Sequence, residues 1–463
     1  MDIEGIIKIL CNGKSDAEIE DFLLFHTEKL WNEYKNHLME KILIVENLVK
    51  DLPIVIPNAS VKKGYDNVIA ISCENLTDLK LEGLTEEHGL TIEPQKDGKS
   101  FRIFGTPTQS GTFELSLKYG YKGLEVTDRP YLERKLQIII NPDPRDLWKD
   151  LPVPEDIEFP KENTAMEYVK VESLPDGTPQ KDIVAASKRG RSHAQEGKPR
   201  DDHFKLYHSE ESNWYVIAVA DGAGSAKYSR EGSRIACDVA VSHCVEQLSD
   251  CTSFEDNINL WHLDQASQEA GKAISADIYK IVGNAAYKAH KAIADKAAEH
   301  NDRSKDYATT LLLAICKKFE FGWFIASFWV GDGAMCIFNE EEGTSVLLGT
   351  PDEGDYAGQT RFLTMSDIFS DTASFYNRLK CRIVPDFTAL FLMSDGVSDP
   401  KFETDANLNN PEKWKELWEN LKSDEEHPVD LSDDNEESAQ QLLDWLDFWS
   451  PGNHDDRTIA ILY

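Results

Sequence analysis

Aspartates stand at the ends of predicted strands in the last two thirds of the chain, in a pattern that could support metal-assisted chemistry. They fall in four short motifs, namely Arg200-Asp201-Asp202-His203, Asp221-Gly222-Ala223-Gly224-Ser225, Ser394-Asp395-Gly396-Val397-Ser398-Asp399 and Asp455-Asp456-Arg457-Thr458. Three of these motifs adjoin apolar runs, at 215–220, 389–393 and 459–462, that are typical of strands. Carboxylates at strand ends, beside glycines that allow close backbone approach, suit a cluster of hard divalent cations. Two such cations could ionise water and hold a phosphoryl group.

A single Asp-Gly pair is more typical of a turn than of a metal site, so the interpretation rests on the order of the motifs. Between the second and third motifs, strands are predicted directly after Ala308-Thr309-Thr310 and directly before Gly331-Asp332-Gly333. The whole series resembles the metal-dependent serine/threonine protein phosphatases, the PPM or type-2C family, over about residues 182–463. The phrase Gly190-Arg191-Ser192-His193, followed by Gly197-Lys198-Pro199, is similar to the bacterial branch of that family. The resemblance implies an α+β domain in which helices sandwich two antiparallel sheets.

The resemblance also implies a two-metal centre that uses Mg²⁺ or Mn²⁺. It places Asp221 between the two ions and assigns the carbonyl of Gly222 to one of them. Asp395 and Asp455 would complete one metal site. The pair Asp201-Asp202, where the family usually has Glu-Asp, would serve the other ion directly or through water.

A third and weaker metal site is implied as well. Asp332 and Asp399 match the positions that hold such an ion in many family members. Asp221, Asp395 and Asp455 would then hold the metal-bound water that attacks phosphorus in line. Such a reaction needs no phosphorylated enzyme intermediate, in agreement with the absence of a Cys-x5-Arg motif.

One position departs from the family pattern. Better-known members place a phosphate-binding arginine four residues before the acidic pair, where this chain has Gly197. Arg191 and His193 are the candidates for that role, with Arg200 a weaker one. His193 is equally suited to a structural role. Arg457 is expected to be a surface residue of the final turn or a partner for a nearby carboxylate.

The elements that would position these residues occupy the last of four predicted segments. Residues 1–51 have apolar side chains at helical spacing and predict a helical segment. From 52 to 142 the apolar period is two, with frequent turn signals, which predicts a small all-β domain. Prolines among charges at 143–180 predict a linker. Mixed strands and helices at 181–463 predict the α+β phosphatase-like domain.

The β segment carries a second resemblance. Gly105-Thr106-Pro107 followed by Ser110-Gly111-Thr112 is similar to a phrase that recurs in bacterial immunoglobulin-like modules. The resemblance implies a β-sandwich without catalytic residues, which would act as a spacer or a docking module.

The segment 349–381, which contains Asp355-Tyr356-Ala357-Gly358-Gln359-Thr360, lies between two predicted core strands. The type-2C family carries a variable flap beside its active site at this place. A role in substrate selection is therefore favoured over an ordinary long connection.

The composition of the chain limits the classes of molecule that it is expected to bind. The net charge of −34 argues against nucleic acid and membrane surfaces, because both are polyanions. No apolar stretch approaches the length of a membrane helix, and the first residues do not resemble a secretory signal. Eight cysteines without a Cys-x-x-Cys pair favour a reducing cytoplasm.

The sequence thus predicts a phosphoserine/phosphothreonine phosphatase, with a phosphoprotein substrate and a cognate serine/threonine kinase as partners. Two other functions stay open. The domain could be a phosphatase-like scaffold that binds a kinase or phosphoprotein, or a hydrolase of a small phosphoester. The presence of all the expected core carboxylates favours an active enzyme.

Overall fold

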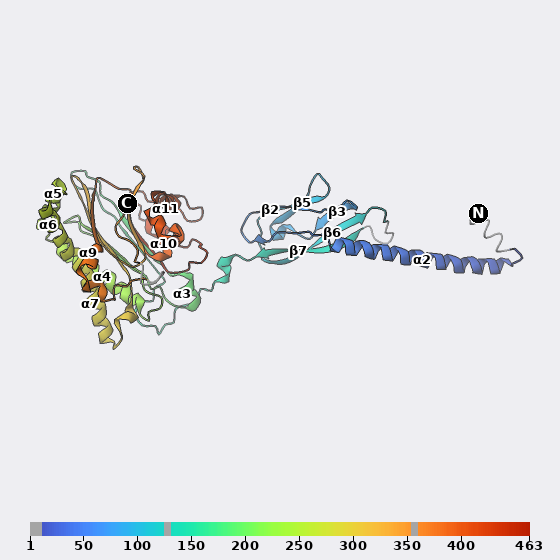
Figure 1. Ribbon diagram of the computed structural model, residues 1–463, viewed down its shortest axis with the longest axis horizontal. Helices are drawn as coiled ribbons and strands as arrows, with labels where there is room; N and C mark the ends of the chain where they lie inside the picture. The colour runs from blue at the N-terminus through green and yellow to red at the C-terminus, as the bar shows by residue number, and fades with distance from the viewer. Residues whose placement is uncertain (1–11, 125–130, 353–359) are drawn as a thin grey trace. The chain divides into compact units, whose positions relative to one another are not determined.

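A computed structural model describes residues 12–124, 131–352 and 360–463 (Figure 1). It divides the chain into two compact units, Met1–Leu147 and Trp148–Tyr463. Each unit has its own hydrophobic core. None of the described helices is long and apolar enough to cross a membrane.

The first unit begins with a long helix, α2 (Asp16–Lys50), as the helical periodicity predicts. Its start is fixed by reciprocal capping: the Ser15 hydroxyl accepts a hydrogen bond from the Glu18 N–H, and the Glu18 carboxylate accepts one from the Ser15 N–H. These bonds satisfy donors that the first helical turn leaves free. Only Val45 and Val49 of α2 are buried in the part of the chain that the structure describes.

Seven strands form two sheets in the described residues of the first unit. The larger has the order β1 (Ala59–Ser60), β7 (Leu132–Asn141), β6 (Gly111–Tyr121) and β3 (Leu76–Glu82). The smaller has the order β2 (Tyr65–Ala70), β5 (Ser100–Gly105) and β4 (Leu90–Pro94). Inward-facing residues of both sheets, such as Ile103 and Leu115, share one core with Val45 and Val49. The strand-rich segment is confirmed, whereas its immunoglobulin-like assignment stays a prediction.

The second unit contains two larger sheets, in which every pairing is antiparallel. One has the order β10 (His203–His208), β11 (Tyr215–Ala220), β12 (Leu311–Phe319), β13 (Gly322–Val330) and β16 (Leu379–Val384). The other has the order β15 (Thr344–Leu347), β14 (Ala334–Asn339), β17 (Ala389–Met393), β18 (Arg457–Leu462), β9 (Ile183–Lys188) and β8 (Thr164–Val169).

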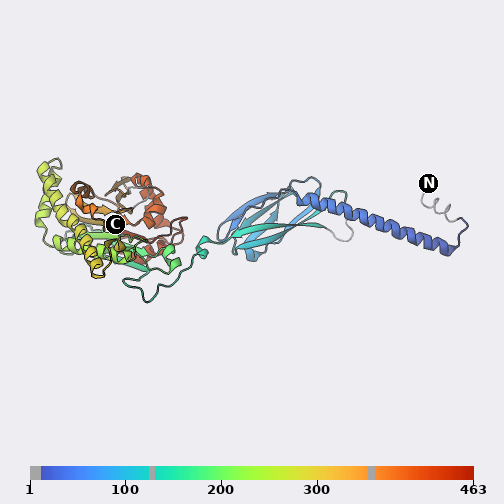
Figure 2. The ribbon, with the colours of Figure 1, turned by 60° about the horizontal axis from the view of Figure 1, so that its bottom comes forward.

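Helices cover the outer faces of both sheets (Figures 1 and 2). On the five-stranded side lie α4 (Ser229–Leu248), α5 (Thr252–Leu263), α6 (Gln268–Ile278), α7 (Asn284–Glu299), α8 (Asp367–Ser370) and α9 (Thr372–Asn377). On the six-stranded side lie α10 (Asp395–Phe402), α11 (Pro411–Ser423) and α12 (Ser438–Trp445), while the short α3 (Arg191–Glu196) follows β9. The α+β class and the two antiparallel sheets are as predicted.

Strand β11 shows how the layers are held together. All six of its residues are buried. The odd-numbered ones belong to the core that joins the two sheets, and the even-numbered ones belong to the core under α4 and α7. A strand that is buried on both faces needs an unbroken apolar run, which is why 215–220 reads Tyr-Val-Ile-Ala-Val-Ala.

Part of the segment 143–180, predicted as a semi-extended linker that is partly ordered against its neighbours, forms a strand of the second unit. Strand β8 pairs with β9 from Thr164 to Val169 and forms an edge of the six-stranded sheet. Upstream of it, the Leu151 N–H donates to the carbonyl of Ala194 at 2.9 Å. The prolines are compatible with this packing because an edge strand and its approach need few backbone donors.

Candidate metal centre

Strand register gathers the acidic motifs. His203 pairs with Ala220, so Asp202 before β10 and Asp221 after β11 stand at the same edge of the five-stranded sheet. Met393 pairs with both Ala334 and Ile459, which brings the motifs before β14, after β17 and before β18 to one edge of the other sheet. Because antiparallel partners begin and end at shared edges, motifs far apart in sequence meet here.

The carboxylates of Asp221, Asp332 and Asp395 form the centre of this site. Each offers an oxygen, and these oxygens lie within 4.8 Å of one another. Burial and the neighbouring charges of Asp395 and Asp202 raise the pKa of Asp221 well above its usual range. Burial and the charges of Asp332 and Asp455 do the same to the pKa of Asp395. The group therefore behaves as a set of carboxylates that repel one another.

Asp202 joins the same cluster from β10. One of its carboxylate oxygens accepts a hydrogen bond from the Thr458 hydroxyl at 2.7 Å. Burial, with the charge of Asp456, raises the pKa of Asp202 to about 7, and its side chain also hydrogen-bonds to that of Asp221. We call Asp202, Asp221, Asp332 and Asp395 the central cluster.

The central cluster fits a metal ion. One oxygen (Oδ1) of each of Asp202, Asp332 and Asp395 is buried and has no hydrogen-bond partner within the described parts of the chain. Buried polar atoms are ordinarily paired, and like charges held together are unfavourable unless a cation balances them. Hard oxygen donors of this kind are the ligands that Mg²⁺ and Mn²⁺ take.

Backbone contacts hold Asp221 in place. Its N–H donates to the Thr310 hydroxyl at 2.8 Å, and its carbonyl accepts from the Thr309 hydroxyl at 2.8 Å. The next residue, Gly222, passes so close to Asp201 that a Cβ would lie 2.5 Å from the Asp201 carbonyl oxygen. Glycine is therefore required at this point of the metal-site loop, and Thr309-Thr310 has a structural reason to accompany Asp221.

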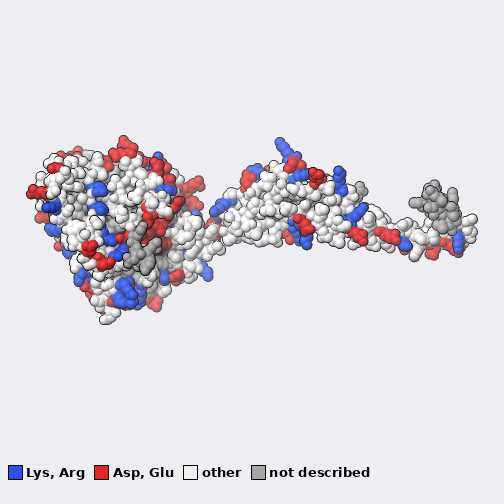
Figure 3. Space-filling model, viewed as in Figure 1, with Lys and Arg blue, Asp and Glu red and all other residues white. Residues whose placement is uncertain are grey.

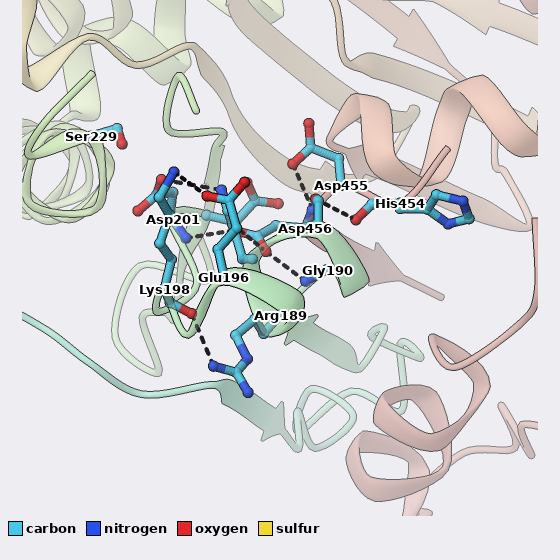
Figure 4. A network of polar contacts seen from close by, with 12 residues as sticks. Arg189, Gly190, Glu196, Lys198, Asp201, Ser229, His454, Asp455 and Asp456 are labelled. Atoms are coloured by element: carbon cyan, nitrogen blue, oxygen red, sulfur yellow. Dashed lines mark hydrogen bonds and ion pairs between the residues drawn. The ribbon is translucent and has the colours of Figure 1, made fainter. Parts of the chain in front are cut away.

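Asp456, which the sequence prediction left without a role, lies in a separate buried site, and Figure 4 shows it near Gly190 and Asp455. Its carboxylate accepts from the N–H groups of Gly190 at 2.6 Å and Asp201 at 2.5 Å, and it lies 3.0 Å from the ring nitrogen Nδ1 of His193. Although burial opposes the charge, these partners hold the pKa of Asp456 below its usual range. The signal in the sequence was the doubled aspartate at Asp455-Asp456, of which only the first was assigned.

His193 lies between Asp456 and Asp201. Burial, the largest influence, disfavours its charged form, but the hydrogen bond with Asp456 together with the charges of Asp456, Asp201 and Asp455 raises the pKa of His193 to about 9. The other ring nitrogen, Nε2, lies 3.7 Å from the Asp201 carboxylate. Asp201 therefore faces a histidine cation, and its pKa is raised to about 6, chiefly by burial.

Two further predicted ligands lie beside the central cluster. The Asp455 carboxylate accepts a hydrogen bond from the N–H of Asp456, and one of its oxygens lies within 4.8 Å of ligand atoms of His193 and Asp456. Its charge also raises the pKa of Asp395. Asp399, on the first turns of α10, has its pKa raised to about 6 by burial and by Asp332. The structure thus brings the predicted metal residues to one end of the sheets.

The three arginines are engaged elsewhere. Arg191 donates to the carbonyl of Asp447 at 3.1 Å and stacks on the ring of Trp449. Arg200 is buried and donates to the carbonyl of Ser187 at 3.0 Å. The expectation for Arg457 is wrong: the side chain is buried, donates to the carbonyls of Leu446 and Phe448, and packs on the Phe448 ring.

The predicted flap meets the site at its two ends. Thr360 donates a hydrogen bond to the Asp332 carboxylate. Upstream, Asp352 accepts from the Gly331 N–H at 2.9 Å and pairs with Arg378 through two hydrogen bonds. Residues 353–359, with most of the predicted substrate-selecting sequence, lie outside the described residues.

A groove of about 580 Å³ opens beside Asp201. Lys198, Lys227 and Arg230 line it together with the chain segment at 156–158. Arg230 donates to the carbonyl of Glu158 at 2.6 Å, which fixes that segment along the groove. The groove beside the acidic centre is therefore lined by side chains of both charges, with Asp156, Glu158, Asp201 and Asp306 beside the three cations.

The sequence profile of the protein phosphatase 2C family matches residues 189–447. This match spans more than half of the chain, and the protein belongs to that family. No curated protein sequence matches the chain.

Eight of the solved structures that are similar to the chain have TM-scores between 0.34 and 0.39. A sex-determining protein of C. elegans aligns at 14% identity and TM-score 0.39, over 61% of this chain and 65% of that one. A bacterial serine phosphatase aligns at 15% identity and TM-score 0.34, over 60% and 96%. The serine/threonine phosphatase of Staphylococcus aureus aligns at 14% identity and TM-score 0.34, over 66% and 98%. The chain thus spans slightly less than two thirds of the nematode protein.

Proposed function

We propose that this chain is a metal-dependent phosphatase that hydrolyses phosphoserine and phosphothreonine in a protein substrate. Membership of the protein phosphatase 2C family supports the reaction class. The observation that carries the proposal is the set of buried carboxylate oxygens of Asp202, Asp332 and Asp395 that have no partner in the described chain. Groups whose pKa values are strongly shifted by burial and by like charges are typical of functional sites.

The residues that would hold two Mg²⁺ or Mn²⁺ ions are the central cluster with Asp455, together with the carbonyl of Gly222. The ions would supply a water that is ionised near neutral pH and positive charge for the phosphoryl oxygens. Asp332 and Asp399 would hold a third ion, as expected from the family. Asp201 would act on the metal site through water, because its carboxylate faces His193 at 3.7 Å.

The chain's own residues would then orient the ligands and the phosphate. Thr309 and Thr310 fix the backbone of Asp221, while Thr458 holds one oxygen of Asp202. His193 and Arg191 are the proposed phosphate-binding residues. His193 is the better placed of the two, because Arg191 would have to leave its contacts with Asp447.

The groove beside Asp201 suits the polypeptide around the phosphorylated residue. Its volume of about 580 Å³ exceeds what a phosphate group alone needs, and Lys198 and Lys227 could pair with an acidic segment. A phosphoprotein, and a kinase that supplies it, are therefore the proposed partners. We place this reaction in the cytoplasm, as the cysteine usage predicts.

The test is hydrolysis by the purified full chain with and without Mn²⁺. A phosphothreonine peptide, p-nitrophenyl phosphate and a nucleoside triphosphate are compared at equal concentration. The proposal predicts Mn²⁺-dependent release of phosphate, fastest from the peptide, and loss of all release after Asp395→Asn. A preference for the nucleotide would instead favour a small-phosphoester hydrolase. Absence of turnover, together with tight binding of the phosphopeptide, would favour a scaffold.

A further inference from the structure

Helix α2 carries an unusual number of exposed apolar side chains. Ten of the twenty-one large apolar residues that are exposed in the described chain lie on this helix, at 39–67% exposure. They are Phe22, Leu24, Phe25, Leu30, Trp31, Tyr34, Met39, Leu43, Ile44 and Leu48. Much of the surface of α2 is correspondingly uncharged in Figure 3. Single exposed apolar residues are common, but a concentration of this kind marks an interaction surface.

Part of this surface forms a regular seam. Counted in alternating steps of four and three, one line of residues along the helix is Glu20, Leu24, Thr27, Trp31, Tyr34, Leu38, Lys41, Val45 and Leu48. This spacing is the heptad repeat by which two helices pack side by side. The β-sheets of the first unit pack against the seam only near its C-terminal end, where Val45 is buried. From Leu24 to Leu38 the seam has no cover among the described residues.

The charges along α2 select one direction for a second helix of the same sequence. Residues 16–28 contain five acidic side chains and no lysine or arginine, whereas 29–50 contain four lysines and three glutamates. A parallel pair would place the two acidic ends together. It would also set Glu20 against Glu20 and Lys41 against Lys41 inside the seam. An antiparallel pair avoids both repulsions and brings the acidic half of one helix beside the lysine-containing half of the other.

An antiparallel pair also has one well-matched register. With the pair centred between Trp31 and Tyr34, Trp31 lies opposite the partner's Tyr34, and Thr27 lies opposite the partner's Leu38. On the flank of the seam, Glu28 then lies beside the partner's Lys35, and the two-fold symmetry repeats this ion pair. The pairing ends near Glu20, opposite the partner's Val45, which is where the β-sheets cover the seam.

We propose that α2 is a self-association helix through which two copies of this chain form an antiparallel dimer. In this register the contact surface is the seam from Leu24 to Lys41, with Leu24 opposite the partner's Lys41. The inference concerns the first unit alone and does not depend on the proposed phosphatase activity.

The mass of the full chain in solution tests this proposal. Sedimentation equilibrium should give twice the chain mass of 52.3 kDa at micromolar concentration. Trp31→Glu places a carboxylate at the centre of the seam and should weaken association by at least about 30-fold, as expected for a central aromatic anchor. Asn36→Glu, an equally exposed position on the opposite side of α2, is the matched control and should leave the dimer intact. Circular dichroism of both variants separates a lost contact from a lost helix.

Charge reversal tests the direction. Glu28→Lys and Lys35→Glu should each weaken the dimer several-fold, and the double variant should restore it, because the ion pair is then rebuilt with its signs exchanged. A dimer that is indifferent to all three variants contradicts the antiparallel register.

A full chain that stays monomeric at tens of micromolar overturns the proposal. Vesicles of phosphatidylglycerol and phosphatidylcholine provide the second arm of the experiment. A monomer that sediments with them would assign the apolar surface of α2 to a membrane instead of a second copy. A monomer that does not sediment with the vesicles would show that the apolar surface of α2 drives neither self-association nor membrane binding.

Discussion

Two neighbouring groups of carboxylates in the second unit, one mostly half-buried and one buried, have opposite electrostatic character. In the central cluster, three carboxylate oxygens have no hydrogen-bond partner among the described residues, and burial with like charges raises the pKa of Asp221 and Asp395. In the neighbouring group, the Asp456 carboxylate is surrounded by two backbone N–H groups and His193, and its pKa is lowered.

The difference separates two uses of the same side chain. A carboxylate whose acceptor positions are filled by donors stabilises the fold and is ionised without help. Carboxylates that lack hydrogen-bond donors make the fold less stable unless a bound cation balances their charge. The hydrogen-bond partners of the carboxylates distinguish the two groups most clearly.

The largest expected effect follows from Asp221→Asn. The amide removes negative charge from the middle of the central cluster, and in the proposed scheme it weakens both metal sites at once. Hydrolysis of p-nitrophenyl phosphate at saturating Mn²⁺ should fall below a few per cent of the wild-type rate. A higher residual rate in a folded variant would contradict the bridging role.

Asp332 and Asp399 should differ in their effect on metal binding. Asp332 is a member of the central cluster, whereas Asp399 is not in the group of carboxylates whose oxygens lie within 4.8 Å of one another there. Calorimetric titration with Mn²⁺ should show that Asp399→Ala leaves the tight binding unchanged and lowers only the weakest site. Asp332→Ala should in addition reduce the tight affinity. The division fails if Asp399→Ala eliminates all tight binding.

Asp456→Ala should lower stability rather than remove a metal ligand. It leaves two N–H groups and a charged His193 buried without their acceptor, which corresponds to about 3–5 kcal/mol for a broken buried pair. Chemical denaturation in EDTA measures the loss. Asp250→Ala, at an exposed position of the same unit, is the control and should change stability by less than about 0.5 kcal/mol.

The smallest effect is expected from removing the first unit. A chain that begins at Trp148 should keep its rate on p-nitrophenyl phosphate within a few-fold, because the residues of the site all lie in the second unit. Its rate on the protein substrate should fall if the first unit provides docking. The cut belongs at Trp148 and not later, since Leu151 hydrogen-bonds to α3. Equal loss on both substrates, in a folded chain, would show that the first unit completes the site.

The strand ends that carry Asp221 and Asp395 could be predicted from sequence, because an unbroken apolar run followed by Asp-Gly is a local signal. The family pattern then ordered the motifs. The gathering of Asp202 beside Asp221, in contrast, depends on the pairing of His203 with Ala220 across the sheet.

Other features could not be read locally. Asp456 looks like its neighbour Asp455 in the sequence, and only the approach of Gly190 and His193 from more than 250 residues away defines its role. Arg457 was expected at the surface because arginine is usually exposed. Its side chain is instead buried, where it donates hydrogen bonds to two carbonyl oxygens and one hydroxyl of the preceding loop. Strand β8 was likewise not predicted, because the prolines at 143–180 indicated a linker and the strand is defined by its pairing with β9.

The most direct test of the central claim compares Asp395→Asn with Asp456→Asn in the absence of metal. Both changes replace a carboxylate by an amide of the same shape, so each removes the charge without a change in side-chain size. Thermal unfolding of the full chain in EDTA, followed in the second unit's transition, should rise for Asp395→Asn because repulsion is relieved. It should fall for Asp456→Asn because the amide cannot replace a carboxylate that accepts three hydrogen bonds. A shift of the same sign in both variants would contradict the account.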